Sequence, residues 1–418
     1  MNSQTHNNDV IVIGGGIIGI CASYYLQKSG KKLLLLEQNQ VGTGSSYGNT
    51  GWIVPSHSIP IKSPGTLQTL KWLLNPKSPF YIKPTFNIDL WDWLIKFRKY
   101  SSSSNIENRI SLSTKLSQES LNLYKEIIQS ENIHCEFEQK GIIQLHNDER
   151  SFEEGVKDAE LLRLNGIKSN ILIQKELKLI EPSIKSNIYG GIHFINDAYL
   201  NPFTTVSSLA NIFIKNGGII YPNTQVEDLH INGNKITSIS TNKGIYTSKY
   251  IVLATGAWSS KLMKKIGVNL PIQPAKGYSI SFKNTKNTPT RPLILSETRV
   301  GISPFNNYFR AAGTLELSGL NLKIAPKRIE SIKKAIHSYI DIDLKNSSED
   351  IWCGMRPLSP DGLPLIGLTS KIDNLMISTG HSTTGVTLAA VTGKIIQQLI
   401  DSQKPLIDIE KLSPNRFI

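Results

Sequence analysis

The sequence predicts an α/β fold in which a Rossmann-like domain is interleaved with an α+β domain containing a mixed β-sheet. The first observation is local. A β-branched run at Val10–Ile13, a helical pattern at Ile17–Lys28 and an apolar run at Leu33–Leu36 follow one another, in the order of a right-handed βαβ unit. The second observation concerns the whole chain. Strand-like and helical segments alternate in blocks, which favours interleaved domains over two domains in series.

In the first half of the chain we expect a helical, aromatic stretch from Leu67 to about Ile128, followed by strands in "GIIQLHN" and "GGIHFINDAYLNP" around a helical "FEEGVKDAELLRLNG". A helix at Phe203–Lys215 and short strands up to Tyr250–Ala254 come next. The last part should contain a polar helix at Lys327–Ile340, a turn region at Gly354–Gly367 and a final helix at Val386–Ile400. We assign residues 1–85, 201–270 and 346–418 to a dinucleotide-binding domain. Residues 86–200 and 271–345 then form a substrate-binding domain.

Composition limits the class of protein. The 418 residues suffice for two domains, and Lys and Arg outnumber Asp and Glu by 13 (46 − 33). This excess suits an anionic partner such as acidic lipid, nucleic acid or an anionic substrate, although the lysines are scattered and form no dense basic block. We expect no nucleic-acid partner.

The three cysteines, Cys21, Cys135 and Cys353, lie far apart and lack CxxC spacing. This argues against a disulfide framework, a zinc site and a dithiol centre, so no metal site is predicted and a reducing compartment is favoured. The apolar run at the N-terminus follows nine residues without Lys or Arg, unlike a signal peptide. We expect a cytoplasmic protein.

The segment "LWDWLIKFRKY" allows two interpretations. Its aromatic side chains could form a core face with a solvated rim, or they could contact a membrane beside neighbouring cations. The residues concerned are Trp91, Trp93 and Phe97, with Lys96, Arg98 and Lys99. Contact of this kind would place the protein peripherally on the inner face of the cytoplasmic membrane.

A glycine motif near the N-terminus predicts a dinucleotide ligand. Gly14, Gly16 and Gly19 form G-x-G-x-x-G between a strand and a helix, where the glycines permit a tight turn, close approach of a pyrophosphate and close helix packing. Glu37 ends the second strand, where a carboxylate can accept hydrogen bonds from both ribose hydroxyls. An acid at this position disfavours a 2′-phosphate.

A second segment favours FAD over NAD. "YIVLATGAWS" is a buried strand that runs into Thr255, Gly256 and Ala257, as in flavoproteins that bind the dinucleotide from a distant segment. The chain has no second G-x-G-x-x-G for a nicotinamide nucleotide and no CxxC for a dithiol. A flavin here would be reduced directly by an organic substrate.

The chain resembles the FAD-dependent D-amino acid oxidase superfamily, and within it the D-amino acid dehydrogenase branch. The resemblance runs nearly end to end. It is carried, in order, by "VIVIGGGIIG", "GTGSSYGNTGWIVPSHS", "YIVLATGAWS", "PAKGYSISF", "GMRPLSPDGLPLIG" and "NLMISTGHSTTGVTLAAVTGK". It implies that the small residues of the second motif run under the pyrophosphate and along the flavin ring, and that the last motif opens a helix whose N-terminus faces the flavin pyrimidine.

The motifs and the resemblance together predict non-covalent FAD held by Gly14, Gly16, Ile17, Ile18, Gly19, Glu37, Gln38, Ser45, Ser46, Asn49, Gly51, Trp52, Val226, Thr255, Gly256, Ala257, Gly380, His381, Ser382, Thr383, Thr384 and Gly385. Relatives commonly carry glycine where Ser382 stands. Covalent attachment through Cys353 is disfavoured, because its register would turn the thiol to the opposite face of a strand.

Arg356 matches the arginine that pairs with the substrate α-carboxylate in the resembled family, and its planar fork suits that geometry better than a lysine. An ordinary salt bridge is the alternative. Tyr278, Arg310 and His57 are further candidates for substrate contact.

The resemblance implies oxidative deamination of D-amino acids to 2-oxo acids and ammonia, with electrons passed to a quinone or another non-oxygen acceptor. The alternatives are oxidation of D-proline, D-hydroxyproline, glycine or sarcosine and, less favoured, an FAD-dependent tRNA-modification module.

Overall fold

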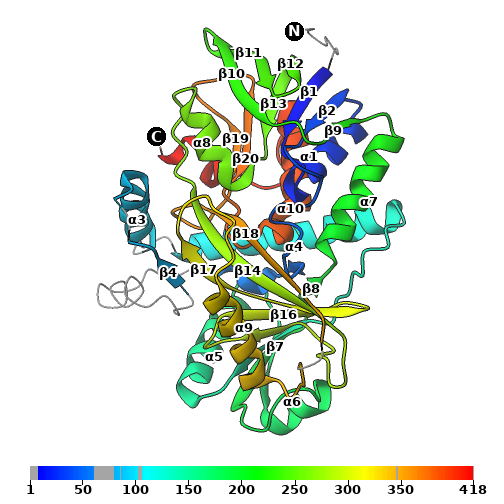
Figure 1. Cartoon of the computed structure of the whole chain (residues 1–418), viewed down its shortest axis with the longest axis vertical. Coiled ribbons are helices and arrows are strands. Elements are labelled where there is room, and N and C mark those ends of the chain that lie inside the picture. Colours follow the sequence, from blue (N-terminus) through cyan, green and yellow to red (C-terminus); the bar gives the residue numbers. More distant parts are fainter. Residues whose placement is uncertain (1–7, 61–79, 85, 102–105, 345–346, 418) are drawn as a thin grey trace.

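The computed structural model describes residues 8–60, 80–84, 86–101, 106–344 and 347–417. The upper half in Figure 1 is built on a six-stranded sheet in the order β19-β20-β13-β1-β2-β9. Its strands are β1 (Asn8–Ile13), β2 (Leu33–Leu36), β9 (Ile219–Tyr221), β13 (Ser248–Leu253), β19 (Leu365–Leu368) and β20 (Leu375–Thr379). All neighbouring pairs are parallel except β19 with β20. The predicted βαβ unit is therefore present.

Both faces of this sheet are buried, which explains its near-continuous apolar strands. Val10 and Val12 of β1 face helices, whereas Ile11 and Ile13 face the opposite layer. The helices are α1 (Ile17–Lys28), α4 (Ile106–Ser130), α7 (Pro202–Lys215) and α10 (Gly385–Ile400). The opposite layer consists of β10 (Val226–Asn232), β11 (Lys235–Thr241), β12 (Gly244–Tyr246) and α8 (Ser259–Lys264).

The lower half contains a mixed sheet in the order β18-β14-β17-β16-β15-β5-β7-β6, with β4 added beside β17. Its strands are β4 (Phe80–Ile82), β5 (Ile142–His146), β6 (Ser169–Ile173), β7 (Gly190–Phe194), β14 (Gln273–Lys283), β15 (Leu293–Leu295), β16 (Val300–Pro304), β17 (Tyr308–Leu317) and β18 (Glu349–Leu358). The helices of this half are α3 (Ile88–Ser101), α5 (Glu149–Arg163), α6 (Gln174–Ile180) and α9 (Pro326–Tyr339). A short pair, β3 (Trp52–Ile53) and β8 (Ala198–Tyr199), lies between the halves.

The domain boundaries stay a prediction, but three elements join other layers than those boundaries suggest. β4 and β18 belong to the mixed sheet, and α4 contributes Leu116, Tyr124 and Ile127 to the core beneath the parallel sheet.

The expected turn at Gly354–Gly367 is wrong at its start. Residues up to Leu358 continue β18, including Pro357. Proline is tolerated there because β18 is an edge strand, paired only with β14 in this sheet.

Helices α1 and α10 cross so closely at Gly393 that no side chain fits at this position. A Cβ atom added at Gly393 would lie 2.6 Å from the Cys21 carbonyl carbon and oxygen. Gly393→Ala should therefore lower the free energy of unfolding by about 1–3 kcal/mol, the usual cost of overpacking, measured by urea titration.

Gly385→Ala on the same helix is the control, because its added methyl would meet only the His381 Cβ at 3.7 Å. This change should leave the midpoint unchanged or raise it, since alanine favours a helix. Equal destabilisation by both changes would contradict the close-crossing explanation.

Candidate active site

A cavity of about 620 Å³ opens where the parallel strands end, between the two sheets. Ile13, Leu36 and Ala254 contribute the strand ends, and Trp352, Gly354 and Arg356 of β18 contribute the opposite wall. Ligands of open α/β sheets bind at this edge. The cavity thus occupies the place where both halves can contribute to one site.

The glycine turn forms one end of this cavity. Gly14 has φ +108°, and a Cβ atom there would lie 2.5 Å from the Ala254 carbonyl oxygen. Beside it the Gly15 amide donates to Glu37 Oε2 at 2.7 Å, and the Ile17 amide at the start of α1 donates to Ser46 Oγ at 3.0 Å. Backbone amides and the dipole of α1 at this point favour an anionic group.

The loop from Gly42 to Trp52 runs along the cavity and is held by the mixed sheet. Ser45 Oγ donates to the Met355 carbonyl at 2.5 Å. Gly48 lies directly under an indole ring, because a Cβ atom there would come within 2.0 Å of Trp352. The close approach of β18 therefore requires a glycine at position 48.

Most of the residues predicted to bind the cofactor line the cavity. These are Gly14, Gly16, Ile17, Ile18, Glu37, Gln38, Ser45, Ser46, Asn49, Val226, Thr255, Gly256, Ala257, His381, Ser382, Thr383 and Gly385.

Five predicted residues lie outside the lining. Gly19 packs against Gly14, and Gly51 faces the Leu200 carbonyl, which a Cβ atom would approach to 1.8 Å. Trp52 donates from Nε1 to Ser303 Oγ at 2.7 Å and so links the loop to β16. Gly380 packs against Leu365 and Ile272, and Thr384 lines a smaller neighbouring chamber.

Sequence reasoning missed two lining residues, Trp352 and Ser378. Trp352 stands four residues before the predicted Arg356 on β18, so strand alternation, applied once β18 is recognised, places both on one face. Ser378, at the end of β20, has a buried Oγ without a hydrogen-bond partner among the described residues. A ligand hydroxyl or carbonyl could satisfy that atom.

Arg356 is a cation of the cavity wall and stands on β18. Its Nη1 donates to the Thr314 carbonyl at 3.1 Å. No carboxylate forms an ion pair with it in the part of the chain that the structure describes, so the alternative of an ordinary salt bridge finds no support there. Burial lowers the pKa of Arg356 to about 10, which still leaves it charged at neutral pH. A half-buried cation without a carboxylate partner favours an anionic ligand.

Tyr278 is turned away from Arg356. Ala275 pairs with Arg356 and Tyr278 with Cys353 across β14 and β18, so the two side chains project from opposite faces of the sheet. Tyr278 contributes to the cavity wall, but its hydroxyl donates to Glu316 at 3.0 Å. The Cys353 thiol likewise points to the far face and donates to the Leu322 carbonyl, as expected from its register.

Arg310 lines neither cavity. Its Nη1 donates to the carbonyls of Tyr47 at 2.7 Å and Asn49 at 2.9 Å, and its Nε donates to Ser281 Oγ. The structure therefore places this buried guanidinium away from the predicted substrate contact. It ties the Gly42–Trp52 loop, from here on the cofactor loop, to β17.

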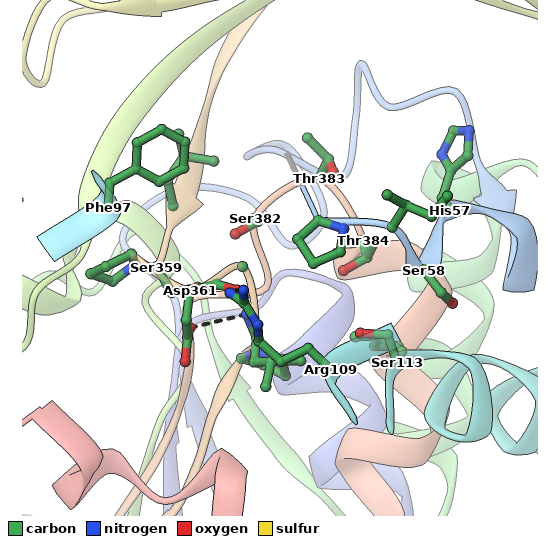
Figure 2. Close-up of a pocket in the computed structure, with 18 of the residues that line it drawn as sticks. His57, Ser58, Phe97, Arg109, Ser113, Ser359, Asp361, Ser382, Thr383 and Thr384 are labelled. Atoms are coloured by element: carbon green, nitrogen blue, oxygen red, sulfur yellow. Dashed lines mark hydrogen bonds between the residues drawn. The ribbon is translucent and has the colours of Figure 1, made fainter. Parts of the chain in front are cut away.

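His57 lies beside the site, in a chamber of about 70 Å³ that adjoins the large cavity at Ser382 and Thr383 (Figure 2). The chamber is lined on one side by Arg109, Ser113 and Ser117, which are spaced by four residues and share one face of α4. His57 itself is exposed, and nearby protein atoms and then the charge of Arg299 lower the pKa of its imidazole.

The other walls of the chamber explain its polarity. Arg109 Nη1 donates to the Asp361 carbonyl oxygen at 3.2 Å (Figure 2), while the Asp361 carboxylate accepts from Arg416 Nε at 2.8 Å and Nη2 at 3.0 Å. Trp93 and Phe97 close an apolar side. The chamber is thus a small space with one aromatic and several hydroxylated walls.

The residues present fit FAD. The glycine turn and the start of α1 suit a pyrophosphate, Glu37 stands at the end of β2, and the unpartnered Ser378 hydroxyl and the start of α10 lie farther along the same cavity. The start of α10 carries a positive dipole, which suits a ring that gains negative charge when reduced.

Comparisons with known proteins agree with this geometry. The chain is 27% identical over 416 residues to D-amino acid dehydrogenase 1 of Mesorhizobium japonicum, covering 98% of this chain and 99% of that protein. It is 26% identical over 416 residues to D-amino acid dehydrogenase of Agrobacterium fabrum, with the same coverage. The resemblance seen in the sequence is confirmed.

Two solved structures share the fold. Glycine oxidase from Geobacillus kaustophilus superposes with a TM-score of 0.80 at 20% identity, covering 99% of this chain and 100% of that one. L-proline dehydrogenase from P. horikoshii gives a TM-score of 0.77 at 20% identity, covering 99% and 98%. The predicted fold class is confirmed.

The family described as FAD dependent oxidoreductase has a sequence profile that matches residues 9–399. The predicted FAD cofactor and oxidoreductase class are confirmed by this match. By its sequence and its fold, the chain belongs to the FAD dependent oxidoreductase family.

Proposed function

We propose that this protein oxidises D-amino acids to imino acids, which water hydrolyses to 2-oxo acids and ammonia, and passes the electrons to a quinone or another non-oxygen acceptor. The observation that carries the proposal is Arg356, a half-buried guanidinium in the wall of the flavin cavity without a carboxylate partner among the described residues. An α-carboxylate is the matching anion. The relatives named D-amino acid dehydrogenase support the same substrate class.

The chain's own contribution is orientation and charge. FAD, when bound, supplies the acceptor for the hydride of the substrate α-carbon. Arg356 would hold the carboxylate, and the cofactor loop, fixed by Arg310, would keep the ring in register with it. His381 lines the cavity, but burial lowers its pKa to about 3 and its Nε2 contacts Thr392 Oγ1 at 3.0 Å. We therefore assign no general base, and a substrate with a neutral amine would react once oriented.

Glycine, sarcosine, D-proline and D-hydroxyproline form the second candidate class. The structural neighbours named glycine oxidase and L-proline dehydrogenase favour it. These substrates carry the same α-carboxylate, so Arg356 would serve them equally. The pocket side chains, and not the arginine, would decide between the classes.

We further propose that one face of α3 contacts an anionic membrane, where a quinone acceptor would be found. Trp93 and Phe97 of the expected aromatic face are buried and stack on each other at 5.0 Å. Trp91 of the expected face is exposed, and so are the apolar side chains of Phe86, Ile88 and Ile95 in and just before α3. Lys96, Arg98 and Lys99 follow on the same helix, which suits anionic lipid headgroups. No described helix is long and apolar enough to span a bilayer.

The proposed reaction predicts that D-amino acids bleach the visible absorbance of the bound flavin under anaerobic conditions. L-Enantiomers should leave the spectrum unchanged at the same concentration, and glycine, sarcosine and D-proline complete the panel. Bleaching by L-forms only would contradict the proposed stereochemistry. Bleaching by glycine or sarcosine far faster than by any D-amino acid would favour the second class.

Arg356→Gln should raise the KM for D-alanine at least about 30-fold, because a lost charge-assisted contact to a buried carboxylate costs about 2 kcal/mol or more. Lys265→Gln is the matched control, a cation of the same cavity that donates to the Glu227 carbonyl on the far side. It should leave this KM unchanged. Unchanged kinetics of Arg356→Gln, with normal flavin content, would remove the assigned role.

The α3 face predicts that the double change Trp91→Ser with Ile95→Ser weakens binding to phosphatidylglycerol vesicles at least about tenfold, because each apolar side chain loses its burial in the interface. Co-sedimentation measures the effect. Leu179→Ser is the control, since Leu179 is 83% exposed but belongs to a different helix, α6. Equal binding of the double variant and the wild type would contradict the assignment of this face.

A further inference from the structure

Thr314 stands at a break in the mixed sheet. β14 and β17 pair at Lys276 with Glu316 and again at Tyr278 with Gly313, so β17 has one residue more than β14 between these pairs. On its other side β17 pairs with β16 up to Gly313 and with β4 from Leu315 onward. Thr314 is therefore a bulged residue at the point where β17 changes partners.

The backbone of Thr314 is strained. Its φ is +65°, a conformation that is unfavourable for a β-branched residue. Its Oγ1 is buried and has no hydrogen-bond partner among the described residues. Since the side chain gains no polar contact there, the surrounding sheet must impose this conformation, as is common at functional sites.

The bulge aims a carbonyl at the proposed carboxylate-binding residue. Arg356 Nη1 donates to the Thr314 oxygen at 3.1 Å. Gly277 lies opposite the bulge on β14, and a Cβ atom there would come within 1.6 Å of Arg356 Nη1 and 2.5 Å of its Cζ. The guanidinium thus occupies the space that a side chain at position 277 would take, and it is held at one nitrogen by the bulge. Its Nε and Nη2 donate to no residue in the described part of the chain.

We infer that Thr314 is a positioning residue, whose bulged backbone and the gap at Gly277 fix the plane of the Arg356 guanidinium so that its other donors can meet a substrate carboxylate. The inference rests on the proposed function of Arg356. A free arginine side chain has many rotamers, and ordering one on binding lowers affinity. A fork that is already oriented avoids this loss, because its bidentate geometry is present before the substrate arrives.

The test compares D-alanine with D-alaninamide, which lacks the carboxylate. Thr314→Gly removes the strain and the restriction on the backbone while keeping the peptide carbonyl. It should leave the flavin content unchanged and should not lower the melting temperature. The KM for D-alanine should rise about five- to tenfold, the order expected for ordering one long side chain, with a much smaller change in kcat. Kinetics with D-alaninamide should stay as in the wild type.

Three variants make this result specific. Gly277→Ala should also reduce the preference for D-alanine over its amide, because the methyl group takes the place of the guanidinium. Thr314→Asn should keep most of the preference, since asparagine tolerates positive φ. Asn132→Gly is the matched control: it relieves a φ of +50° at an exposed turn after α4 and should change nothing.

A readout without turnover accompanies the kinetics. The dissociation constant for acetate, read from the perturbation of the flavin spectrum, should rise in Thr314→Gly and Gly277→Ala and stay constant in Asn132→Gly. Wild-type preference and acetate affinity in Thr314→Gly, while Arg356→Gln loses both, would overturn the inference and leave the proposed function intact. A wild type that treats D-alanine and its amide alike would instead overturn the role of Arg356, and the inference would fall with it.

Discussion

The placement of one guanidinium constrains the contact between the two sheets. A cation that is partly withdrawn from water loses part of its hydration, and this loss must be offset by polar groups that face it. At Arg356 the offset comes from a backbone carbonyl and from the open cavity beside it, because the described residues provide no carboxylate. Two features of the neighbouring strands meet at this position. Gly277 has no side chain where the guanidinium lies, and the bulge of β17 at Thr314 presents the carbonyl that the guanidinium contacts.

The cofactor end of the cavity obeys a different constraint, which is the close approach of backbones. Gly14 and Gly19 let the first strand, the start of α1 and the end of β13 meet without side chains between them. Gly48 does the same for the cofactor loop and Trp352. The loop is then tied to the mixed sheet by the Arg310 guanidinium and by the Trp52 indole. These contacts hold the loop against β16 and β17, and its contacts at Ser45 and Gly48 hold it against β18.

Local patterns in the sequence predicted the parts of this arrangement that depend on neighbouring residues. The βαβ unit, Glu37 at a strand end and the helix after Gly385 could be read from spacing alone, because strand and helix periods are local properties. Tyr278 and Arg310 could not be placed in this way. Their orientation depends on which residue of β18 or β17 lies opposite, and that register is set by pairings between segments far apart in the chain. His57 follows the cofactor loop closely, yet a 3₁₀ turn at Pro55–Ser58 brings it to the neighbouring chamber.

The arginine proposed to hold the substrate carboxylate and the neighbouring chamber are built from different elements. Arg356 comes from the mixed sheet, and its position is determined by strand pairing, which changes little when surface side chains change. The chamber beside Ser382 and Thr383 is built from other elements, namely α4, the turn after β18 and the segment around His57. Its walls carry serines and an arginine on one face and aromatic rings on the other. Substitutions there would leave the guanidinium in place, since among the described residues only Ser382 and Thr383 line both spaces.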